Sequence, residues 1–454
     1  MKKNGFIVLI AIAAMLCCQI TESFAIDAET EAQEQVPNII AEAAVVMDAK
    51  SGEVLYEKNA DEIKEMASTT KIMTALVVLE NIPLDTVVTV DAQAAAVEGA
   101  GIGLQVGEEI SVRELLYALF LKSANDSAIA LAKAAGGSME NFVEMMNQKC
   151  EQLGLENTNF KNPHGLHDDG HYTSARDLAI LSKVAMQYDT IRTCAGTISH
   201  TIPKTNVSEA RHLKNINHLL FDSKREVDVN GSMRSVKYEG ICGLKTGYTQ
   251  EAKNCISAVC KRGDSEYIVT LLGSSKDGKY ADTIALLDWA FAHFSSIKIM
   301  DYMQGEALPI KMGKNKKTKA VVQQDVYVSI PKSADASKIN YTIEPIENLE
   351  APIERNQRIG DLKIYYEGEL LKIVPTYAKD SNERGGVVSL LRNLFAVRSL
   401  VWVLAVVIFA LLLKLYANRK KRIEEEREEE RKRKALEIEM ERVHQNMQRF
   451  ARYK

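Results

Sequence analysis

Ser68 and Lys71 stand three positions apart at the start of a predicted helix, so both side chains project from one face. A serine hydroxyl is a weak nucleophile that needs an adjacent base. A lysine can be that base only when burial or a neighbouring cation lowers its pKa, and Lys245 is a candidate cation. Four apolar residues flank the pair and would bury it: Met66, Ala67, Ile72 and Met73. The pair indicates covalent acyl transfer, although the same pattern also occurs on ordinary surface helices.

Ser123-Ala124-Asn125 falls between two predicted helices, where a loop can aim side chains into a cleft. Ser123 could relay a proton between Lys71 and a leaving amine. Asn125 could bind a substrate amide and orient Lys71. The alternative is plain helix capping, which serine and asparagine also favour.

Lys245-Thr246-Gly247 lies on a strand predicted over residues 243–249. A peptide substrate can add to a sheet edge through main-chain hydrogen bonds, and Gly247 leaves no side chain in its way. Lys245 and Thr246 would then bind a terminal carboxylate, one by its charge and one by its hydroxyl. A solvent-facing strand end is the alternative.

The order of the three motifs is more informative than any one of them. S-x-x-K, S-x-N and K-T-G follow one another at Ser68, Ser123 and Lys245, much as in the trio of penicillin-binding proteins and class A β-lactamases. Together they indicate a serine acyl-transfer enzyme that acts on an amide resembling D-alanyl-D-alanine.

A separate cluster of polar residues suggests metal binding: His164, His167, Asp168, Asp169 and His171. The segment leads directly into Ser174-Ala175-Arg176-Asp177, which resembles a capping box that opens a helix. Because short local matches of this kind are often false, we expect no metal here and no other cofactor.

The remaining pattern predicts an α+β fold, in which helices flank an antiparallel sheet and form an all-helical subdomain. Strands are expected at residues 43–47, 54–56, 255–260 and 267–273. Helices are expected at residues 70–79, 112–121, 126–134, 139–152, 174–186 and 280–294. These elements make up a catalytic domain over residues 37–294.

Composition changes after this domain. Alternating apolar residues predict strands near residues 326–330, 339–343, 362–366 and 370–374. A small all-β domain is therefore expected over residues 297–380. Gly385-Gly386 then marks a hinge before the C-terminal part.

Two apolar segments lie near the ends of the chain. Residues 1–25 are typical of a signal peptide, with Lys2 and Lys3 before an apolar stretch and a small-residue cleavage site ending at Ala25. Residues 399–416 form the second apolar run, and the basic residues 419–422 follow it as on the cytoplasmic side of a membrane span. We expect a transmembrane helix at 399–416 and a charged cytoplasmic helical tail at 417–454. A helix lying on the membrane surface is the alternative.

The tail also carries a short heptad-like pattern. Its apolar residues recur at alternating spacings of four and three: Leu436, Met440, Val443, Met447 and Phe450. This pattern predicts a two-heptad coiled coil, and thus self-association through the tail, although confident assignments need three or four heptads.

Net charge and cysteine content bear on two questions, whether the protein binds nucleic acid and whether it forms disulfides. The net charge is −4 over 454 residues with no basic stripe outside the tail, so no nucleic-acid partner is expected. Two of the seven cysteines fall in the signal peptide. The other five are an odd number without metal-ligand spacing, which predicts buried apolar thiols rather than a disulfide framework.

The chain resembles the D-alanyl-D-alanine carboxypeptidases among the low-molecular-mass penicillin-binding proteins. Besides the three motifs, four stretches are similar to those of the family: residues 48–52 (Asp-Ala-Lys-Ser-Gly), 162–166 (Asn-Pro-His-Gly-Leu), 170–173 (Gly-His-Tyr-Thr) and 243–249. Residues 351–353 and 357–360 resemble its small C-terminal β domain. The likeness covers about residues 37–376 and implies a β-lactamase/transpeptidase-like fold.

The resemblance also implies a mechanism. Ser68 would be acylated with Lys71 as the base, and Ser123 and Asn125 would form the second catalytic pair. The reaction would remove the terminal D-alanine from peptidoglycan pentapeptide stems, through an acyl-enzyme that water hydrolyses. β-Lactams would acylate the same serine. The catalytic part would work on the extracytoplasmic face of the cell membrane.

The same resemblance places the substrate along the third motif. Lys245 and Thr246 would bind its carboxylate beside Gly247, and the backbone N–H groups of Ser68 and Tyr248 would form the oxyanion hole. Two features depart from the family pattern. Lys253 stands where a glycine is common, and a membrane span replaces the usual amphipathic anchor. Neither departure removes a catalytic group.

Other functions stay open. A class A β-lactamase needs a glutamate that activates the deacylating water, and the only candidate between the second and third motifs, Glu226, lies too near Lys245 in the sequence. A non-catalytic sensor or scaffold for muropeptides or β-lactams is disfavoured because Ser68 and Lys71 are both intact. Transpeptidation and endopeptidation leave no short motif, so the sequence does not separate them from hydrolysis.

Overall fold

The computed structural model describes residues 36–451, and the predicted signal peptide lies outside them. The chain divides into two compact units. The first comprises the residues up to Gln304 together with Val322–Thr342 and Leu362–Val374. The second comprises Gly305–Val321, Ile343–Asp361 and the residues from Pro375 onward.

An antiparallel sheet forms the centre of the first unit. Its five strands lie in the order β2-β1-β11-β10-β9, with bounds β1 Ala43–Asp48, β2 Val54–Lys58, β9 Ile241–Thr249, β10 Lys253–Arg262 and β11 Ser265–Ser274. In the register of the last pair, Lys245 faces Ser257 and Thr246 faces Ile256. The third motif therefore lies on an edge strand.

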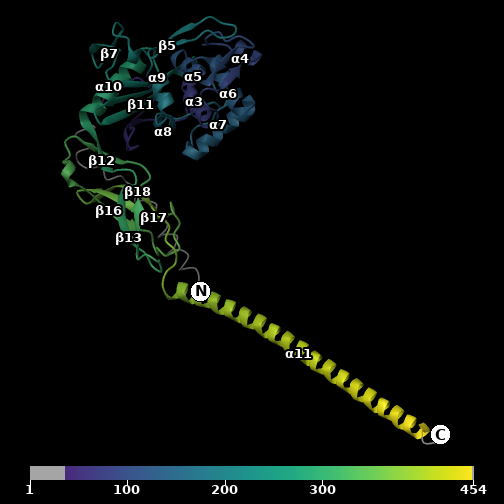
Figure 1. The fold of residues 1–454 in the computed structure, drawn as a ribbon. Helices are drawn as coiled ribbons and strands as arrows, with labels where there is room; N and C mark the ends of the chain where they lie inside the picture. Colours follow the sequence, from purple (N-terminus) through teal and green to yellow (C-terminus); the bar gives the residue numbers. More distant parts are fainter. Residues whose placement is uncertain (1–35, 452–454) are drawn as a thin grey trace, which may run out of the picture. The chain divides into compact units, whose positions relative to one another are not determined.

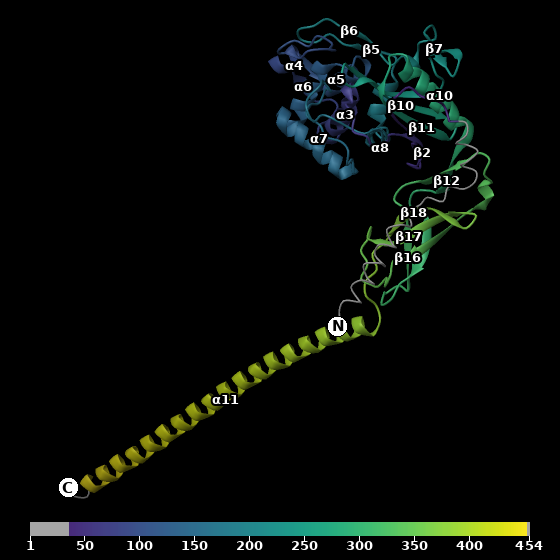
Figure 2. The ribbon, with the colours of Figure 1, turned by 180° about the vertical axis from the view of Figure 1, so that it is seen from behind.

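Side chains of successive strand residues point to opposite faces, and each face has its own core. On one face Val46, Val269 and Ile256 pack with residues of α10 (Gly278–His293). On the other face Val45 and Ile268 pack with the remaining helices. Figures 1 and 2 show this layering from two sides, with α10 on one side of β11 and the helices α3, α5, α6 and α7 on the other.

The helical layer carries the first two motifs. It is built from α3 Lys71–Asn81, α4 Ala92–Ala96, α5 Val112–Leu121, α6 Asn125–Gly136, α7 Met139–Leu153, α8 Ala175–Ala185 and α9 Asp189–Gly196. Ser111, Ser138 and Ser174 cap α5, α7 and α8 by accepting a hydrogen bond from a backbone N–H three residues on. The α+β class and the predicted helices are confirmed, and the observed bounds differ from the predicted ones by a few residues at most.

Several short elements complete the first unit. The hairpins are β3 Val87–Thr89 with β4 Glu109–Ser111, β5 Ser199–Ile202 with β6 Arg211–Lys214, and β7 Glu226–Val229 with β8 Ser232–Ser235. Two 3-10 turns matter for the site, η1 Ala67–Thr70 and η2 His218–Leu220. The sequence pattern predicted none of these hairpins, because strands of three or four residues give little alternation to detect. It did not predict α9 either, a helix of only 8 residues.

Strands follow α10, as predicted. β12 Phe294–Met300 pairs with β15 Val326–Pro331, and a five-stranded sheet has the order β13-β14-β18-β17-β16. Its strands are β13 Gly305–Pro309, β14 Lys317–Val321, β16 Ile339–Pro345, β17 Arg358–Tyr366 and β18 Glu369–Ala378, and the turn η3 Ala336–Lys338 precedes β16.

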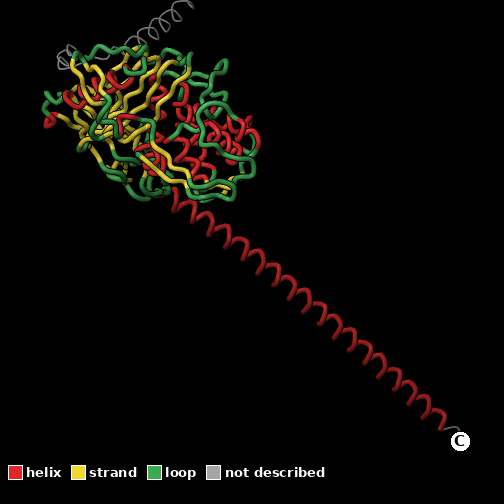
Figure 3. Tube along the Cα trace, turned by 90° about the horizontal axis from the view of Figure 1, so that it is seen from above, coloured by secondary structure: helices red, strands yellow, loops and turns green. Residues whose placement is uncertain are grey.

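The C-terminal helix α11 (Val387–Ala451) runs without a break (Figure 3). Among the residues that the structure describes, no helix is both long and apolar enough to cross a membrane. The span predicted at 399–416 is therefore not confirmed. Side chains 387–401 and 403 lie outside the description, and from Leu404 onward Lys414 interrupts the apolar run.

The tail prediction has a similar outcome. Leu436, Met440 and Val443 lie exposed on α11, and the side chains of Met447 and Phe450 lie outside the described ones. The structure describes one chain, so self-association through these residues is not confirmed.

The burial predicted for the cysteines is confirmed for four of the five, and Cys242 is only partly buried. All five cysteines of the described chain are free, and Cys150, Cys194, Cys255 and Cys260 are buried. Burial raises the pKa of each of these four thiols to about 12, which keeps them protonated and unreactive.

Candidate active site

The nucleophile candidate sits on a strained turn. Ser68 belongs to η1, and the residue before it, Ala67, has a φ of 45°, which a residue with a side chain rarely adopts. The carbonyl of Ala67 accepts a hydrogen bond from Thr70 Oγ1 at 2.7 Å. Gly165 packs so closely here that a Cβ on it would lie 2.0 Å from that carbonyl oxygen. The turn is thus fixed by contacts around it, as strained functional positions require.

Lys71 begins α3 and is fully buried. Its Nζ lies 2.8 Å from Ser68 Oγ and 2.8 Å from Asn125 Oδ1, and it also donates to the carbonyl of His164. The first two motifs therefore meet at this amine, as expected if Asn125 orients Lys71. The carbonyl of His164 was not predicted, because a backbone oxygen has no signature in the sequence.

Burial lowers the pKa of Lys71 well below its usual range, and the charge of Lys245 lowers it further. The carboxylate of Asp126 acts in the opposite direction but does not outweigh them. No ion pair to Lys71 occurs within the described chain. The amine is therefore suited to accept a proton at neutral pH.

A left-handed backbone position and several hydrogen bonds fix the second motif. Ser123 has a φ of 56°, another left-handed position. Asn125 donates from its side chain to the carbonyl of Glu98 at 2.7 Å and from its backbone N–H to that of Ala100 at 2.6 Å. A Cβ at Gly99 would lie 2.8 Å from Asn125 Nδ2. The segment around Gly99 thus fixes the orientation of the Asn125 amide.

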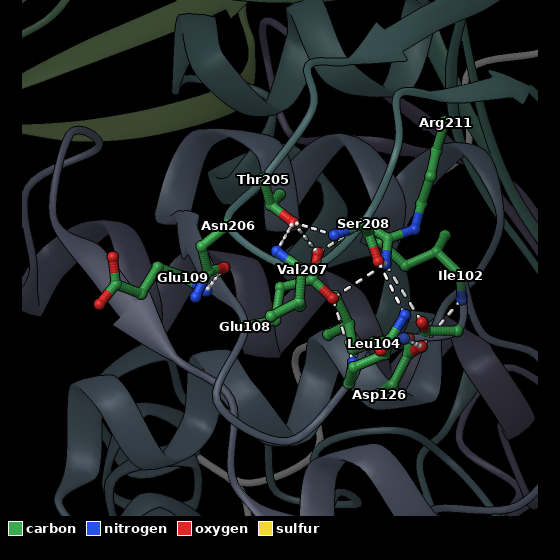
Figure 4. Close-up of polar contacts among 12 residues, drawn as sticks. Ile102, Leu104, Glu108, Glu109, Asp126, Thr205, Asn206, Val207, Ser208 and Arg211 are labelled. Carbon is green, nitrogen blue, oxygen red and sulfur yellow. Dashed lines mark hydrogen bonds and ion pairs between the residues drawn. The ribbon is translucent and has the colours of Figure 1, made fainter.

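A buried ion pair extends this support (Figure 4). Glu108 is fully buried and receives hydrogen bonds from Arg211 at 2.6 and 2.9 Å, from Thr205 Oγ1 at 3.0 Å and from the N–H of Gln105 at 3.0 Å. Asp126 Oδ2 accepts from the N–H groups of Ile102 and Leu104, at 2.9 and 3.2 Å. The segment before β4 is therefore tied to the β5–β6 hairpin at one end and to the start of α6 at the other.

Lys245 is 1% exposed and lies on β9. Its Nζ donates to Ser123 Oγ at 2.9 Å and to the carbonyl of Thr246 at 2.8 Å. Burial, and then the charge of Lys279, lower its pKa to about 7. The pKa of Lys279 itself falls to about 8, mainly through burial. No motif in the sequence indicated that Lys279 lies near the site.

Gly247 has a structural role besides the one predicted for substrate binding. A Cβ on Gly247 would lie 2.9 Å from the backbone nitrogen of Ser68 and 3.0 Å from the Cβ of Ala67. The glycine therefore lets β9 approach η1, whose packing is part of the site. Tyr248 follows with a side chain that is 64% exposed, so its contribution to a site would come from its backbone.

The histidine cluster is not gathered around one point. The Nδ1 of His171 accepts from the N–H of Lys161 at 3.0 Å, and its Nε2 lies 2.7 Å from Thr70 Oγ1. His164 Nδ1 accepts from the N–H of Leu166. Burial lowers the pKa of His164 to about 3 and that of His171 to about 4, so both are neutral. These histidines stabilise the segment that supports Ala67.

One group of side chains in the described chain has ligand atoms close enough for a metal: Glu65, His167 and Glu251. Only His167 belongs to the cluster considered from the sequence. His167 and Glu251 are exposed, and His167 Nδ1 already lies 3.0 Å from Glu65 Oε1. This arrangement includes a polar contact between two partly exposed side chains.

The chain is similar to known proteins over most of its length. A family model described as D-alanyl-D-alanine carboxypeptidase matches residues 29–276, and one described as the C-terminal domain of penicillin-binding protein 5 matches residues 298–384. The carboxypeptidase DacF of Bacillus subtilis is 34% identical over 360 residues, which cover 78% of this chain and 88% of the relative. DacA of Escherichia coli is 30% identical over 354 residues, covering 75% and 83%. The crystal structure of penicillin-binding protein 5 from Haemophilus influenzae matches with a TM-score of 0.65 and 27% identity, covering 77% of this chain and 99% of that one.

Proposed function

Since the chain belongs to the D-alanyl-D-alanine carboxypeptidase family, we propose that Ser68 is its nucleophile and Lys71 the base. The protein is a serine-type carboxypeptidase that removes the terminal D-alanine from peptidoglycan stem peptides. The observation that carries the residue assignment is the 2.8 Å contact between Lys71 Nζ and Ser68 Oγ, with the amine fully buried.

The hydrogen bonds around Lys71 suit a neutral amine. A neutral amine has two hydrogens and one lone pair. The carbonyl of His164 and Oδ1 of Asn125 accept the two hydrogens. The lone pair is then directed at Ser68, where it takes the hydroxyl proton as Oγ attacks the substrate carbonyl. Asn125 is therefore a positioning residue for the base, besides any contact that it makes to the substrate amide.

The other motif residues complete the reaction. The oxygen that becomes negative is stabilised by the backbone N–H groups of Ser68 and Tyr248. Ser123 accepts from Lys245, so its own hydrogen is free to pass to the leaving amine, and the proton that Lys71 took from Ser68 replaces it. Lys245 and Thr246 bind the terminal carboxylate beside Gly247, which leaves room for η1. Water then hydrolyses the acyl-enzyme, and a β-lactam traps the same serine.

Mass spectrometry tests this proposal. Incubation with a pentapeptide stem should remove 1 alanine from it, and a Ser68→Ala variant should leave the peptide intact. Ser232→Ala, which changes an exposed serine on β8, is the matched control and should cleave normally. Binding of the peptide without loss of alanine would instead favour a sensor. Transfer of the acyl group to an added amine would identify transpeptidation.

We also propose that residues 1–25 export the enzyme and that residues 399–416 attach it to the membrane. The support is the sequence pattern and the exposure of Trp402 (72%), Phe409 (62%) and Leu412 (57%) on α11. Protease added to wall-stripped cells should then spare the tail beyond Ala417. Trimming of the tail in intact cells would show that it stays outside, as for a helix on the membrane surface.

A further inference from the structure

A basic cavity of about 510 Å³ lies beside the second motif, within the first unit. The ammonium-bearing residues Lys122, Lys214 and Lys224 line it, together with Asp222. None of these three lysines forms an ion pair within the described chain. Lys214 Nζ lies over the ring of Phe221, 4.3 Å from its centroid. Three cations therefore line one hollow without a carboxylate bound to any of them.

The single carboxylate of the cavity is already engaged. Asp222 Oδ2 lies 2.7 Å from His218 Nδ1, and Oδ1 accepts from the backbone N–H groups of Lys224 and Arg225, at 3.2 and 3.1 Å. These hydrogen bonds lower the pKa of Asp222, the one from His218 most. Even with Asp222 charged, the cavity has an excess of positive charge, which favours a negatively charged occupant.

The cavity is adjacent to the catalytic residues. Lys122 directly precedes Ser123. The N–H of Ile216, another lining residue, donates to the carbonyl of Leu121 at 3.1 Å. The turn η2 packs against β9, and the carbonyl of Leu219 in η2 accepts from the N–H of Tyr238 at 3.0 Å. Tyr238 stands just before β9, so η2, which supplies His218 to the cavity, lies beside the start of that strand.

The proposed function predicts which part of the substrate lies beside this cavity. In that function the scissile carbonyl lies at the N–H of Tyr248 and the terminal carboxylate at Lys245. A substrate that runs in this direction along β9 brings its last residue next to the cavity. The methyl group of alanine would leave nearly all of a cavity of about 510 Å³ unfilled.

We propose that this cavity is a subsite for an acidic side chain on the C-terminal residue of the substrate. Peptides that end in D-alanyl-D-glutamate are then substrates, with their second carboxylate bound by Lys122 and Lys214. This inference rests on the proposed function. The chemistry is unchanged: the ester between Ser68 and the penultimate D-alanine forms, the amide bond breaks, and the leaving amine takes a proton. Water then splits the ester, and the released amino acid is D-glutamate.

Three diacetyl-L-lysyl peptides test the subsite, ending in D-Ala-D-Ala, D-Ala-D-Glu and D-Ala-D-Gln. Glutamine has nearly the same shape as glutamate without the charge, so the ratio of kcat/KM for the last two peptides isolates the charge. Hydrogen bonds to a charged group are the strong ones, and we expect a ratio of about tenfold in favour of D-glutamate. Lys122→Gln and Lys214→Gln should each bring the ratio close to one. Lys237→Gln, an exposed lysine outside the cavity, is the matched control and should retain it.

The outcomes separate the two proposals. Failure to cleave the D-Ala-D-Ala peptide would overturn the proposed function. Cleavage of that peptide with equal kcat/KM for the other two would overturn the subsite alone, as would a preference that survives both substitutions. Thermal unfolding checks the fold of each variant. In the unmodified protein, free D-glutamate should also inhibit about tenfold more strongly than D-glutamine, and equal inhibition would contradict the subsite independently of any variant.

Discussion

Lysine residues behave in opposite ways in the catalytic unit and in the C-terminal helix. Lys71 and Lys245 are buried, make no ion pair within the described chain and have lowered pKa values. On α11, Lys434 is exposed and lies 2.9 Å from Glu430, one turn before it. The hydrogen bond that Lys434 donates to Glu430 raises the pKa of Lys434. Lys71 is thus suited to accept a proton, whereas Lys434 keeps its charge.

The difference lies in what each arrangement requires of the fold. Burying an ammonium group without a counter-ion is unfavourable, so the group becomes neutral unless other contacts offset the loss of hydration. The catalytic unit accepts two such amines, and the strained φ angles of Ala67 and Ser123 are a second unfavourable feature of the same site. The charged side chains of α11 that the structure describes are exposed, so water screens them and each ion pair contributes little. The two buried amines are thus found where the backbone is locally strained.

Removal of the nucleophile should have the largest effect. Ser68→Ala should abolish covalent labelling by a radioactive or fluorescent penicillin, a loss of at least about 10⁴-fold. The hydroxyl makes few structural contacts, so thermal unfolding should change little. A variant that is still labelled at the same rate would show that another residue is acylated.

Lys71→Ala should slow acylation by about 10³-fold, in the range found for general bases. Labelled penicillin, mixed rapidly with the protein, measures this rate. Lys133→Ala is a suitable control, because that lysine is paired with Asp91 outside the site. Normal acylation in Lys71→Ala would mean that burial of this amine serves packing rather than catalysis. Lys71 would then not be the base.

Lys245 should make substrate binding depend on pH near neutrality. Its pKa is lowered to about 7, so it is charged below that pH and loses its charge as the pH rises through it. KM for a peptide with a free carboxylate should therefore rise by up to about tenfold per pH unit above pH 7. Lys245→Arg keeps the charge and should move this rise to higher pH. A KM that rises at the same pH in both proteins would assign the dependence to another group.

The Glu108–Arg211 pair should contribute to stability rather than to chemistry. Burial alone would raise the pKa of Glu108, but the hydrogen bonds from Arg211 and Gln105 outweigh it, and the pKa is lowered. Such a group stabilises the fold above its unfolded-state pKa of about 4.3. That stability is lost as the pH falls through the lower, folded-state value. Glu108→Gln should reduce the free energy of unfolding by about 3 kcal/mol at pH 7.

Urea unfolding at pH 7 and at pH 3 measures this effect. The difference between the unmodified protein and Glu108→Gln should be smaller at the lower pH. Glu209→Gln, in the same hairpin region but exposed and paired with Lys204, is the control and should unfold like the unmodified protein. If Glu108→Gln and the unmodified protein had the same free energy of unfolding at pH 7, the Glu108–Arg211 pair would serve only to position the segment before β4.

The sequence predicted the parts of the site that are local. Ser68 and Lys71 share a helical turn, so their proximity follows from spacing alone. The supports of the site come from distant segments and could not be predicted. His164 contributes a backbone carbonyl 93 residues from Lys71, and Glu108 and Arg211 are 103 residues apart. Such contacts depend on tertiary packing, which leaves no periodic signal in the sequence. The positive φ of Ala67 could not be predicted either, because glycine is the residue that usually marks this conformation.

The smallest effect is expected for the Glu430–Lys434 pair on α11. Glu430→Gln removes one partner of an ion pair whose side chains are 69% and 64% exposed. Because water and salt screen this pair, calorimetry at physiological ionic strength should detect no shift in Tm. A shift as large as that of Glu108→Gln would mean that this part of α11 is buried in solution, against another molecule or a second copy. Dependence of such a shift on protein concentration would identify the second copy, because only self-association makes stability depend on it.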